Sequence, residues 1–218
     1  MILEKELEED YMKNYLINKI DMEEKRNMDN TNLKERLEGI FPIRFENIYV
    51  DKVDAKQLLE FKKNCKIYDN SEITCRPLIK RTDEETLALF NNMLMNENTF
   101  LLGIYEVDEK NNRSDRIIGR ISLYNFNIRN RSVEIGYYMD SNYRGKGIMN
   151  RVMREVCLIL INVAKINKVY AQTASFNIKS IGLLLSIGFK LDARLREHHE
   201  LKGKLYDDYI FSIIASDF

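Results

Sequence analysis

A glycine-rich basic turn is the part of this sequence whose residue types could most directly do chemistry. Arg144-Gly145-Lys146-Gly147-Ile148-Met149 joins a strand-like run to an amphipathic helical pattern, and Gly136 precedes it in that run. Glycines let the backbone approach a ligand closely, and a helix beginning there offers unpaired N–H groups and a positive dipole end. The turn is therefore predicted to bind an anion such as a phosphate or pyrophosphate.

Two other interpretations of this turn compete with anion binding. A Gly-x-Gly before a helix also occurs in ordinary tight turns between a strand and a helix. A dinucleotide-binding βαβ unit would place the turn after its first strand, with a third glycine and a downstream acid. Here three consecutive strand-like runs precede the turn and the third glycine is missing. These departures argue against a dinucleotide site.

Length, charge and hydropathy narrow the class of protein. The 218 residues suit one domain of ordinary size. Lys plus Arg equals Asp plus Glu at 34 each, which gives no electrostatic case for nucleic acid or an anionic membrane as partner. Residues 1–10 lack the basic and apolar regions of a signal peptide, and apolar runs such as 156–161 are too short to span a bilayer. The sequence predicts a cytoplasmic protein.

The cysteines favour neither a disulfide framework nor a metal site. Cys65, Cys75 and Cys157 are few and irregularly spaced, and none belongs to a C-x-x-C pair. Reduced, mostly structural cysteines and no bound metal are therefore expected.

Apolar residues at helical spacing predict an N-terminal helical extension over residues 1–40, continued at its end by Leu33, Leu37 and Ile40. Such a helix would pack on its own domain, or else form a surface for a partner or a second copy in a homodimer. The predicted organisation is thus an extension over 1–40 followed by one domain over 41–218.

From residue 41 the pattern is that of an α/β domain with a mixed sheet. Helices are predicted from the N-cap Asp54, from the capping box Thr82–Glu85, after the glycine turn, and from about Asn177. Three strand-like runs, 99–107, 116–124 and 132–139, are separated by polar turns and predict an antiparallel meander. The predicted strands cover residues 45–50, 99–107, 116–124, 132–139 and 168–173, with two more strands on either side of Lys202-Gly203.

This order of elements resembles the GNAT acyltransferases, and more narrowly their ribosomal-protein (Rim-type) N-acetyltransferase branch. The motifs that carry the resemblance are Ile118-Gly119, residues 130–137, the glycine turn, Asn177-x-x-Ser180-x(7)-Gly188-Phe189, and Leu195-Arg196-Glu197 followed by Gly203 and Tyr206-Asp207. The similarity runs from about Ile43 to the C-terminus. It implies a mostly antiparallel twisted sheet with flanking helices, in which the fourth and fifth strands splay apart.

The resemblance also implies acetyl-CoA as cosubstrate, with no metal. Its pyrophosphate would bind Arg144, Gly145, Lys146, Gly147, Ile148 and Met149, and its pantetheine arm would pair with backbone groups near Tyr138 and Met139. Asn177 would hydrogen-bond that arm, although it also suits a helix N-cap. Gly136 is consistent with a bulge that starts the splay, or with a simple packing requirement.

Three residues are candidates for the chemistry of acetyl transfer. An α-amine titrates near ~8 in water, so a base must take a proton from it. Glu134 matches a family acid and is the first candidate, with a surface or ion-paired glutamate as the alternative. Many relatives ease departure of the thiolate with a tyrosine where this chain has Leu184, whereas Ser180 matches a serine that others use. Ser180 could stabilise the sulfur, or could be a helix serine without a ligand contact.

The last candidate lies before the closing turn, where relatives usually read Arg-Glu-x-Glu. This chain has Arg196-Glu197-His198-His199, so a histidine stands in place of the second glutamate, a proposed base. Imidazole titrates near ~6.5, which suits proton transfer at neutral pH. Adjacent strand residues point to opposite faces, and the register favours His199 as the inward one. An exposed pair of histidines is the alternative.

These features together predict an acyltransferase that moves acetyl from acetyl-CoA to a primary amine, with the N-terminal α-amine of a protein or peptide as first choice. A small-molecule amine, such as a polyamine, an amino acid or an antibiotic, is the alternative acceptor. Leu184 and the N-terminal extension also allow a non-catalytic acyl-CoA-binding or interaction module. The sequence leaves the acyl-chain length and the oligomeric state open.

Overall fold

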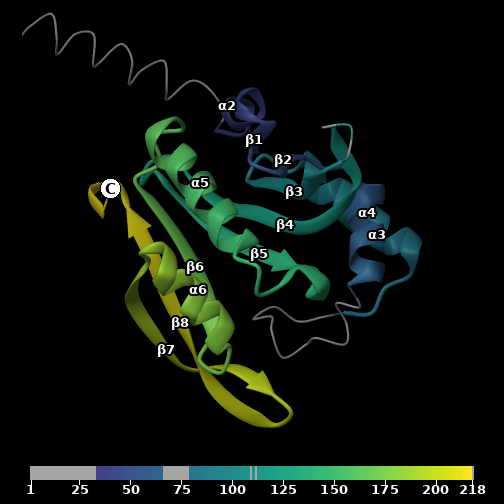
Figure 1. Cartoon of the computed structure of the whole chain (residues 1–218). Coiled ribbons are helices and arrows are strands. Elements are labelled where there is room, and N and C mark those ends of the chain that lie inside the picture. Colours follow the sequence, from purple (N-terminus) through teal and green to yellow (C-terminus); the bar gives the residue numbers. More distant parts are fainter. Residues whose placement is uncertain (1–32, 66–78, 109, 111, 218) are drawn as a thin grey trace, which may run out of the picture.

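The computed structural model describes residues 33–65, 79–108, 110 and 112–217, which build an eight-stranded sheet flanked by helices (Figure 1). The spatial order of the strands is β1-β2-β3-β4-β5-β6-β8-β7. The strands are β1 (Ile43–Phe45), β2 (Ile48–Lys52), β3 (Thr99–Val107), β4 (Arg113–Asn127), β5 (Ser132–Met139), β6 (Lys168–Ala174), β7 (Lys190–Leu201) and β8 (Lys204–Ile214). The α-helices are α2 (Leu33–Ile40), α3 (Ala55–Asn64), α4 (Asp83–Met95), α5 (Ile148–Asn162) and α6 (Ile178–Ile187), with short 3₁₀ turns η2 (Ser141–Tyr143) and η3 (Ala215–Asp217).

The sheet is mostly antiparallel. Strands β3, β4 and β5 form the expected antiparallel meander, and β7 and β8 form a hairpin across residues 202–203. Among the described strands, only β5 and β6 pair in parallel, with α5 as the crossover between them. The predicted fold class, a mixed and mostly antiparallel sheet with flanking helices, is therefore confirmed.

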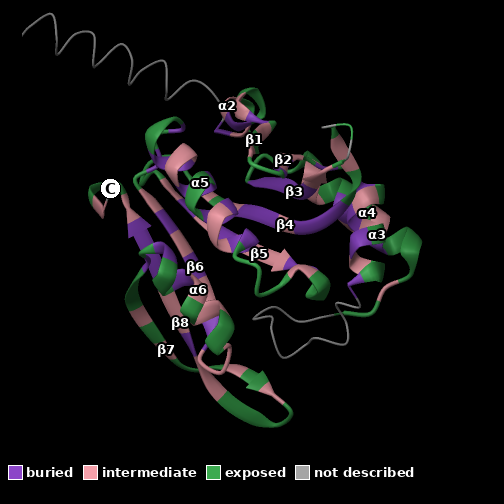
Figure 2. Cartoon of the chain, in the orientation of Figure 1, coloured by how far each residue is buried: buried purple, intermediate pink, exposed green. Residues whose placement is uncertain are grey.

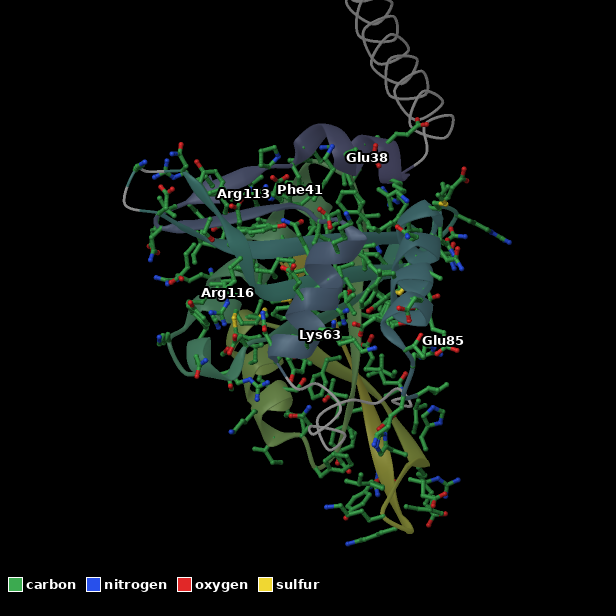
Figure 3. The ribbon with its side chains drawn as sticks, turned by 90° about the vertical axis from the view of Figure 1, so that its right-hand side faces the viewer. Glu38, Phe41, Lys63, Glu85, Arg113 and Arg116 are labelled. Atoms are coloured by element: carbon green, nitrogen blue, oxygen red, sulfur yellow. The ribbon has the colours of Figure 1, made fainter. Side chains whose placement is uncertain are left out.

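Helices cover the two faces of the sheet and enclose two apolar cores. Buried side chains of α2, α5 and α6 share the larger core with strands β2 to β6 and β8, whereas α3 and α4 pack over β3 and β4 (Figure 2). In Figure 3, the labelled residues Lys63 of α3 and Glu85 of α4 mark the face of the sheet that α3 and α4 cover. Within the described residues, no helix is long and apolar enough to cross a membrane.

Side-chain caps begin the two helices over the smaller core. Asp54 accepts a hydrogen bond from the Gln57 N–H at 2.8 Å, and the Gln57 side chain accepts from the Asp54 N–H. Thr82 and Glu85 form the same reciprocal pair at α4. Both predicted caps are confirmed, and each satisfies donors that a helix start leaves unpaired.

The predicted strand over residues 45–50 is wrong. Phe45 pairs with Ile48, so this stretch is a tight hairpin between β1 and β2. Glu46 turns the chain with a φ of 52°, in the left-handed region that sequence alternation does not reveal. The apolar residues on either side of the turn lie in two different strands, and their alternating pattern runs on through the turn.

Helix α2 packs on the domain, while residues 1–32 of the predicted extension lie outside the described residues. Leu33 and Leu37 are buried in the larger core, at 2% and 0% exposure. Arg36 donates to the Ala164 carbonyl at 3.4 Å, and Lys34 donates to the Leu94 carbonyl. The domain boundary between residues 40 and 41 stays a prediction. Leu33 and Leu37, which that boundary assigns to the extension, lie in the larger core of the domain.

Replacing Leu37 by Ala is expected to destabilise the protein by about 2–5 kcal/mol, because it leaves a cavity in the larger core. Glu38→Ala is the matched control on the exposed side of α2 and should stay within about 0.5 kcal/mol. Denaturant unfolding of both variants measures the difference. Equal stabilities would mean that α2 does not belong to the folded core.

Candidate active site

The sheet opens between β5 and β6. The parallel ladder pairs Ser132 with Lys168 and ends at Glu134 opposite Tyr170. Beyond this point, among the described strands, β5 runs on to Met139 paired only with β4, and β6 runs on to Ala174 paired only with β8 (Figure 1). In the described part of the chain, no strand therefore pairs with the far half of β5 on its β6 side. The splay expected between the fourth and fifth predicted strands is confirmed: because the first predicted strand is the β1–β2 hairpin, these two strands are β5 and β6.

Gly136 does not start this opening through a bulge. Its pairing with Ser122 of β4 belongs to a continuous stretch of register. A Cβ at this position would stand 3.0 Å from the Tyr124 ring, closer than ordinary contact. Close packing of Tyr124 over the strand is thus the reason for the glycine, as the alternative expectation had it.

The turn after β5 has a defined backbone. Asp140, only 3% exposed, accepts from the Asn142 N–H at 3.0 Å and from the Arg116 guanidinium at 2.9 Å. Gly145 and Gly147 then adopt φ values of 75° and 74°, which disfavour other residues. A Cβ built on either glycine would meet nothing within 4 Å. These two positions therefore leave open space in front of the start of α5.

Helix α5 begins without a side-chain cap. Gly147 is its N-cap and makes no side-chain hydrogen bond, so the first amides of the helix have no partner from the cap residue. Ile148 and Met149 are buried, at 7% and 9% exposure. Of the predicted cofactor-binding residues, these two could offer only backbone groups, since their side chains belong to the core.

The two cations of the turn lie against aromatic rings. The Arg144 Nε donates to the Met139 carbonyl at 2.9 Å, and its guanidinium lies 5.1 Å from the centre of the Tyr138 ring. The Lys146 Nζ lies 5.1 Å from the centre of the Tyr143 ring. Both side chains are exposed and can swing toward an anion at the helix start. The Met139 carbonyl, expected to face a pantetheine arm, is here the acceptor for Arg144.

Ser180 meets a tyrosine across the opening. The Tyr137 hydroxyl of β5 and the Ser180 Oγ of α6 lie 2.7 Å apart, and either can be the donor. Asn177 caps α6 by accepting from the Ser180 N–H at 3.2 Å. Leu184, at the position where many relatives carry a tyrosine, is fully buried in the core. The phenol near Ser180 therefore comes from β5, a contact that the sequence reasoning missed.

Glu134 lies at the closed end of the opening. It is the last β5 residue in the ladder with β6, and its carboxylate accepts from the Asn125 amide at 2.7 Å. Val133 and Ile135, its neighbours along the strand, belong to the larger core. Glu134 thus points to the opposite face of the sheet, the side of α3 and α4.

His199 lies at the open end, on the same face. Its side chain is 10% exposed, whereas His198 is exposed, so the inward member of the pair is the expected one. The His199 ring packs edge-on against Phe176, with centroids 5.2 Å apart. Its Nδ1 lies 3.8 Å from an oxygen of Asp208, a buried carboxylate that the sequence reasoning missed. A two-residue turn at 202–203 pairs His199 with Tyr206, and alternation then puts Asp208 on the same face, so the signal was present.

The two candidate bases lie at opposite ends of the opening. Glu134 stands beside Tyr170 of β6, and Asp208 stands beside Ala174 at the other end of the same strand. Four residues of an extended strand separate these positions, which is roughly 13 Å. The structure brings Ser180 next to Tyr137 and His199 next to Asp208, but it keeps Glu134 apart from His199.

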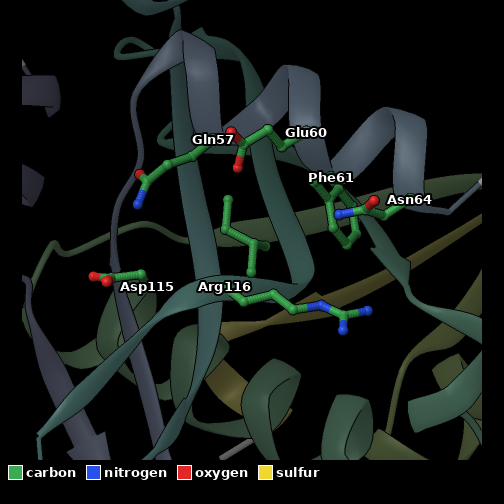
Figure 4. Close-up of a pocket in the computed structure, with 7 residues that line it drawn as sticks. Gln57, Glu60, Phe61, Asn64, Asp115 and Arg116 are labelled. Atoms are coloured by element: carbon green, nitrogen blue, oxygen red, sulfur yellow. The ribbon is translucent and has the colours of Figure 1, made fainter.

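A cavity of about 240 Å³ lies under α3, away from the candidate catalytic residues (Figure 4). The close-up shows Gln57, Glu60 and Asn64 of α3 facing Asp115 and Arg116 of β4, and the cavity is completed by Phe61 and Ile117. Its link to the glycine turn is Arg116, which pairs with Asp140. None of the predicted site residues lines it.

Two of the three cysteines lie within the described residues, and both are buried. Burial raises the pKa of the Cys65 thiol to about 11 and that of Cys157 to about 12. Over the same described ranges, no three His, Cys, Asp or Glu side chains gather as metal ligands would.

Known proteins share this architecture. The family model "Acetyltransferase (GNAT) domain" matches residues 50–190, well over half of the chain. An uncharacterized N-acetyltransferase, p20 of Bacillus licheniformis, is 29% identical over 105 residues, which is 48% of this chain and 59% of that relative. The match thus spans less than two thirds of the relative's length.

Solved structures agree with the fold at low sequence identity. RimL, a ribosomal L7/L12 α-N-protein acetyltransferase in complex with coenzyme A, superposes with a TM-score of 0.69 at 16% identity, covering 80% of this chain and 97% of that one. Spermidine N-acetyltransferase from Vibrio cholerae, in complex with CoA and spermine, gives 0.68 at 17% identity, covering 78% and 97%. The family match and the splayed strands lead to one conclusion: this chain belongs to the GNAT acetyltransferase family.

Proposed function

We propose that this protein transfers acetyl from acetyl-CoA to a primary amine, with the N-terminal α-amine of a protein or peptide as first acceptor. The observation that carries the proposal is the convergence of two features: an open edge of β5 and an uncapped start of α5 that follows it. Such a combination can hold an extended ligand that ends in a phosphate group. The acetyltransferase family to which the chain belongs supports the same conclusion.

The glycine turn fits a pyrophosphate. Gly145 and Gly147 leave space where a side chain would otherwise stand, and amides of the first turn of α5 would donate to phosphate oxygens. Arg144 and Lys146 would move from their aromatic neighbours to add charge-assisted contacts. When bound, acetyl-CoA supplies an activated thioester, and Asn177 together with the open edge near Tyr138 and Met139 would orient its pantetheine arm.

The amine must lose a proton when its nitrogen bonds to the acetyl carbon. A base on the α3 and α4 side of the sheet would take that proton, and Glu134 and His199 are the candidates. As the C–S bond breaks, the sulfur gains negative charge. The Ser180 hydroxyl would donate to that sulfur while the Tyr137 hydroxyl donates to Ser180.

The choice of acceptor follows from the resemblance of this chain to known acetyltransferases. The resemblance to ribosomal-protein acetyltransferases favours an α-amine, whereas the fold is shared equally with a spermidine acetyltransferase. We expect the protein to act in the cytoplasm, as its sequence predicts. We also propose that it can form a homodimer.

The proposed reaction is tested by CoA release in the presence of a thiol reagent, over a panel of peptides, polyamines, amino acids and aminoglycosides. Cys65 and Cys157 should contribute little background, because their raised pKa values keep them protonated at neutral pH. Release with peptides above all others is expected. Acetyl-CoA binding without release for any amine would favour the non-catalytic alternative, and release with polyamines alone would overturn the choice of acceptor.

Gly147→Val should weaken acetyl-CoA binding at least about tenfold, because its side chain obstructs phosphate contacts of 1.5–3 kcal/mol each by order of magnitude. Gly203→Val is the matched control. Gly203 has a φ of 76° and open space at its Cβ, so the backbone strain is similar while the helix start is untouched. Calorimetry on both folded variants measures the affinities. Equal losses would assign the effect to strain and remove the pyrophosphate from this turn.

Ser180→Ala should lower kcat about 100- to 1,000-fold, as loss of a donor to developing charge does elsewhere, with little change in acetyl-CoA affinity. Tyr137→Phe should lower kcat in the same direction, since it removes the hydroxyl behind Ser180. Ser186→Ala on the same helix is the control, because that serine bonds the Leu183 carbonyl and Asn150. Steady-state kinetics give the comparison, and a normal kcat in Ser180→Ala would exclude the proposed role.

A further inference from the structure

The buried carboxylate of Asp208 has one oxygen in need of a donor. Asp208 is 1% exposed, and its Oδ2 accepts from the Gln172 amide at 2.6 Å. Its Oδ1 is buried and has no hydrogen-bond partner in the described part of the chain. A buried carboxylate oxygen without a donor is costly, so the protein should supply one in the working enzyme.

The His199 ring is the neighbour able to meet that need. Its Nδ1 lies 3.8 Å from Asp208 Oδ1, about 1 Å beyond a normal hydrogen bond. Phe176 packs edge-on against both the His199 ring and the Tyr206 ring, at centroid distances of 5.2 and 4.8 Å. Phe176 thus packs against the imidazole and against Tyr206, the residue that His199 faces in β8.

The hairpin is built so that His199 turns inward. The β7–β8 register shifts between Leu195 and His199, and Glu197 within this bulge has a φ of 51°. The Asp207 carboxylate accepts from the Glu197 N–H at 2.9 Å and also bonds Arg194. The two adjacent aspartates therefore act on opposite faces: Asp207 holds the bulge, and Asp208 faces the imidazole.

We propose that Asp208 is a positioning residue that fixes the His199 ring and its tautomer, so that His199 rather than Glu134 takes the proton from the amine. Nδ1–H donates to Asp208 Oδ1, which leaves the lone pair of Nε2 for the amine proton. The amine nitrogen forms the new bond to carbon, its proton passes to Nε2, and the charge of the resulting imidazolium is balanced by Asp208. This inference depends on the proposed acetyl transfer.

The contact itself is tested without turnover, by nitrogen NMR of the histidine rings. The chain has two histidines, and the exposed His198 serves as an internal reference. In the neutral form, His199 should carry its proton on Nδ1, and Asp208→Asn should change that tautomer while leaving His198 unchanged. Asp192→Asn is the control: this carboxylate of the same hairpin bonds Lys168 and Ser212 and should leave both rings as they were. An unchanged His199 in Asp208→Asn would overturn the inference.

The role in proton transfer is tested by a double-mutant cycle on kcat. His199→Ala and Asp208→Asn should each lower kcat, by about 100- to 10,000-fold for the base itself. The double variant should be no slower than His199→Ala, because Asp208 acts through the ring. A further fall in the double variant would mean that Asp208 acts on the substrate directly, and a normal kcat in His199→Ala would return the role of base to Glu134.

Failure of the proposed acetyl transfer and failure of the His199–Asp208 assignment give different results. If the wild-type protein releases no CoA with any amine, the proposed reaction is wrong, while the NMR experiment still decides whether Asp208 sets the His199 tautomer. If turnover occurs but neither His199→Ala nor Asp208→Asn lowers it, the reaction stands and the assignment of these two residues is wrong.

Discussion

The early end of the β5–β6 ladder shapes the centre of this fold. Three parallel pairs hold the two strands together, and after Glu134 each strand keeps only its outer neighbour. Backbone groups along the inner edge of β5 are then left for something other than a strand. Because α5 follows β5 and α6 follows β6, the starts of both helices lie at the mouth of the opening, where their amides and caps can serve a ligand.

The sheet also separates two sets of chemical groups. Along β5, Tyr137 packs toward the core of α5 and α6, where it meets Ser180, whereas Glu134 and Tyr138 face the side of α3 and α4. His199 and Asp208 lie on that second side as well. In the proposed reaction, the donors to the thioester sulfur would therefore lie on the α5 and α6 face, and the base for the amine on the α3 and α4 face.

Local sequence signals carried much of the fold. The capping residues at Asp54 and Thr82, the apolar run of β3, the alternation in β5 and the glycine turn all act over a few residues, and the structure agrees with each. Glu46 and Glu197 have positive φ values, and no residue type in the sequence indicated a turn or a bulge at these two positions. There the hairpin before β2 was taken for one strand, and the bulge that turns His199 inward was not foreseen.

Residue types at short spacing were enough to place most of the helices and strands in order, to predict an anion-binding turn at 144–149 and to identify the candidate residues. The contacts that these residues make depend on the folded chain. Folding joins Tyr137 to Ser180 across 43 positions in the chain, buries Leu184 in the core, and sets Asp208 beside His199. Such contacts depend on strand register and on which face a side chain occupies, and neither is fixed until the whole sheet has formed.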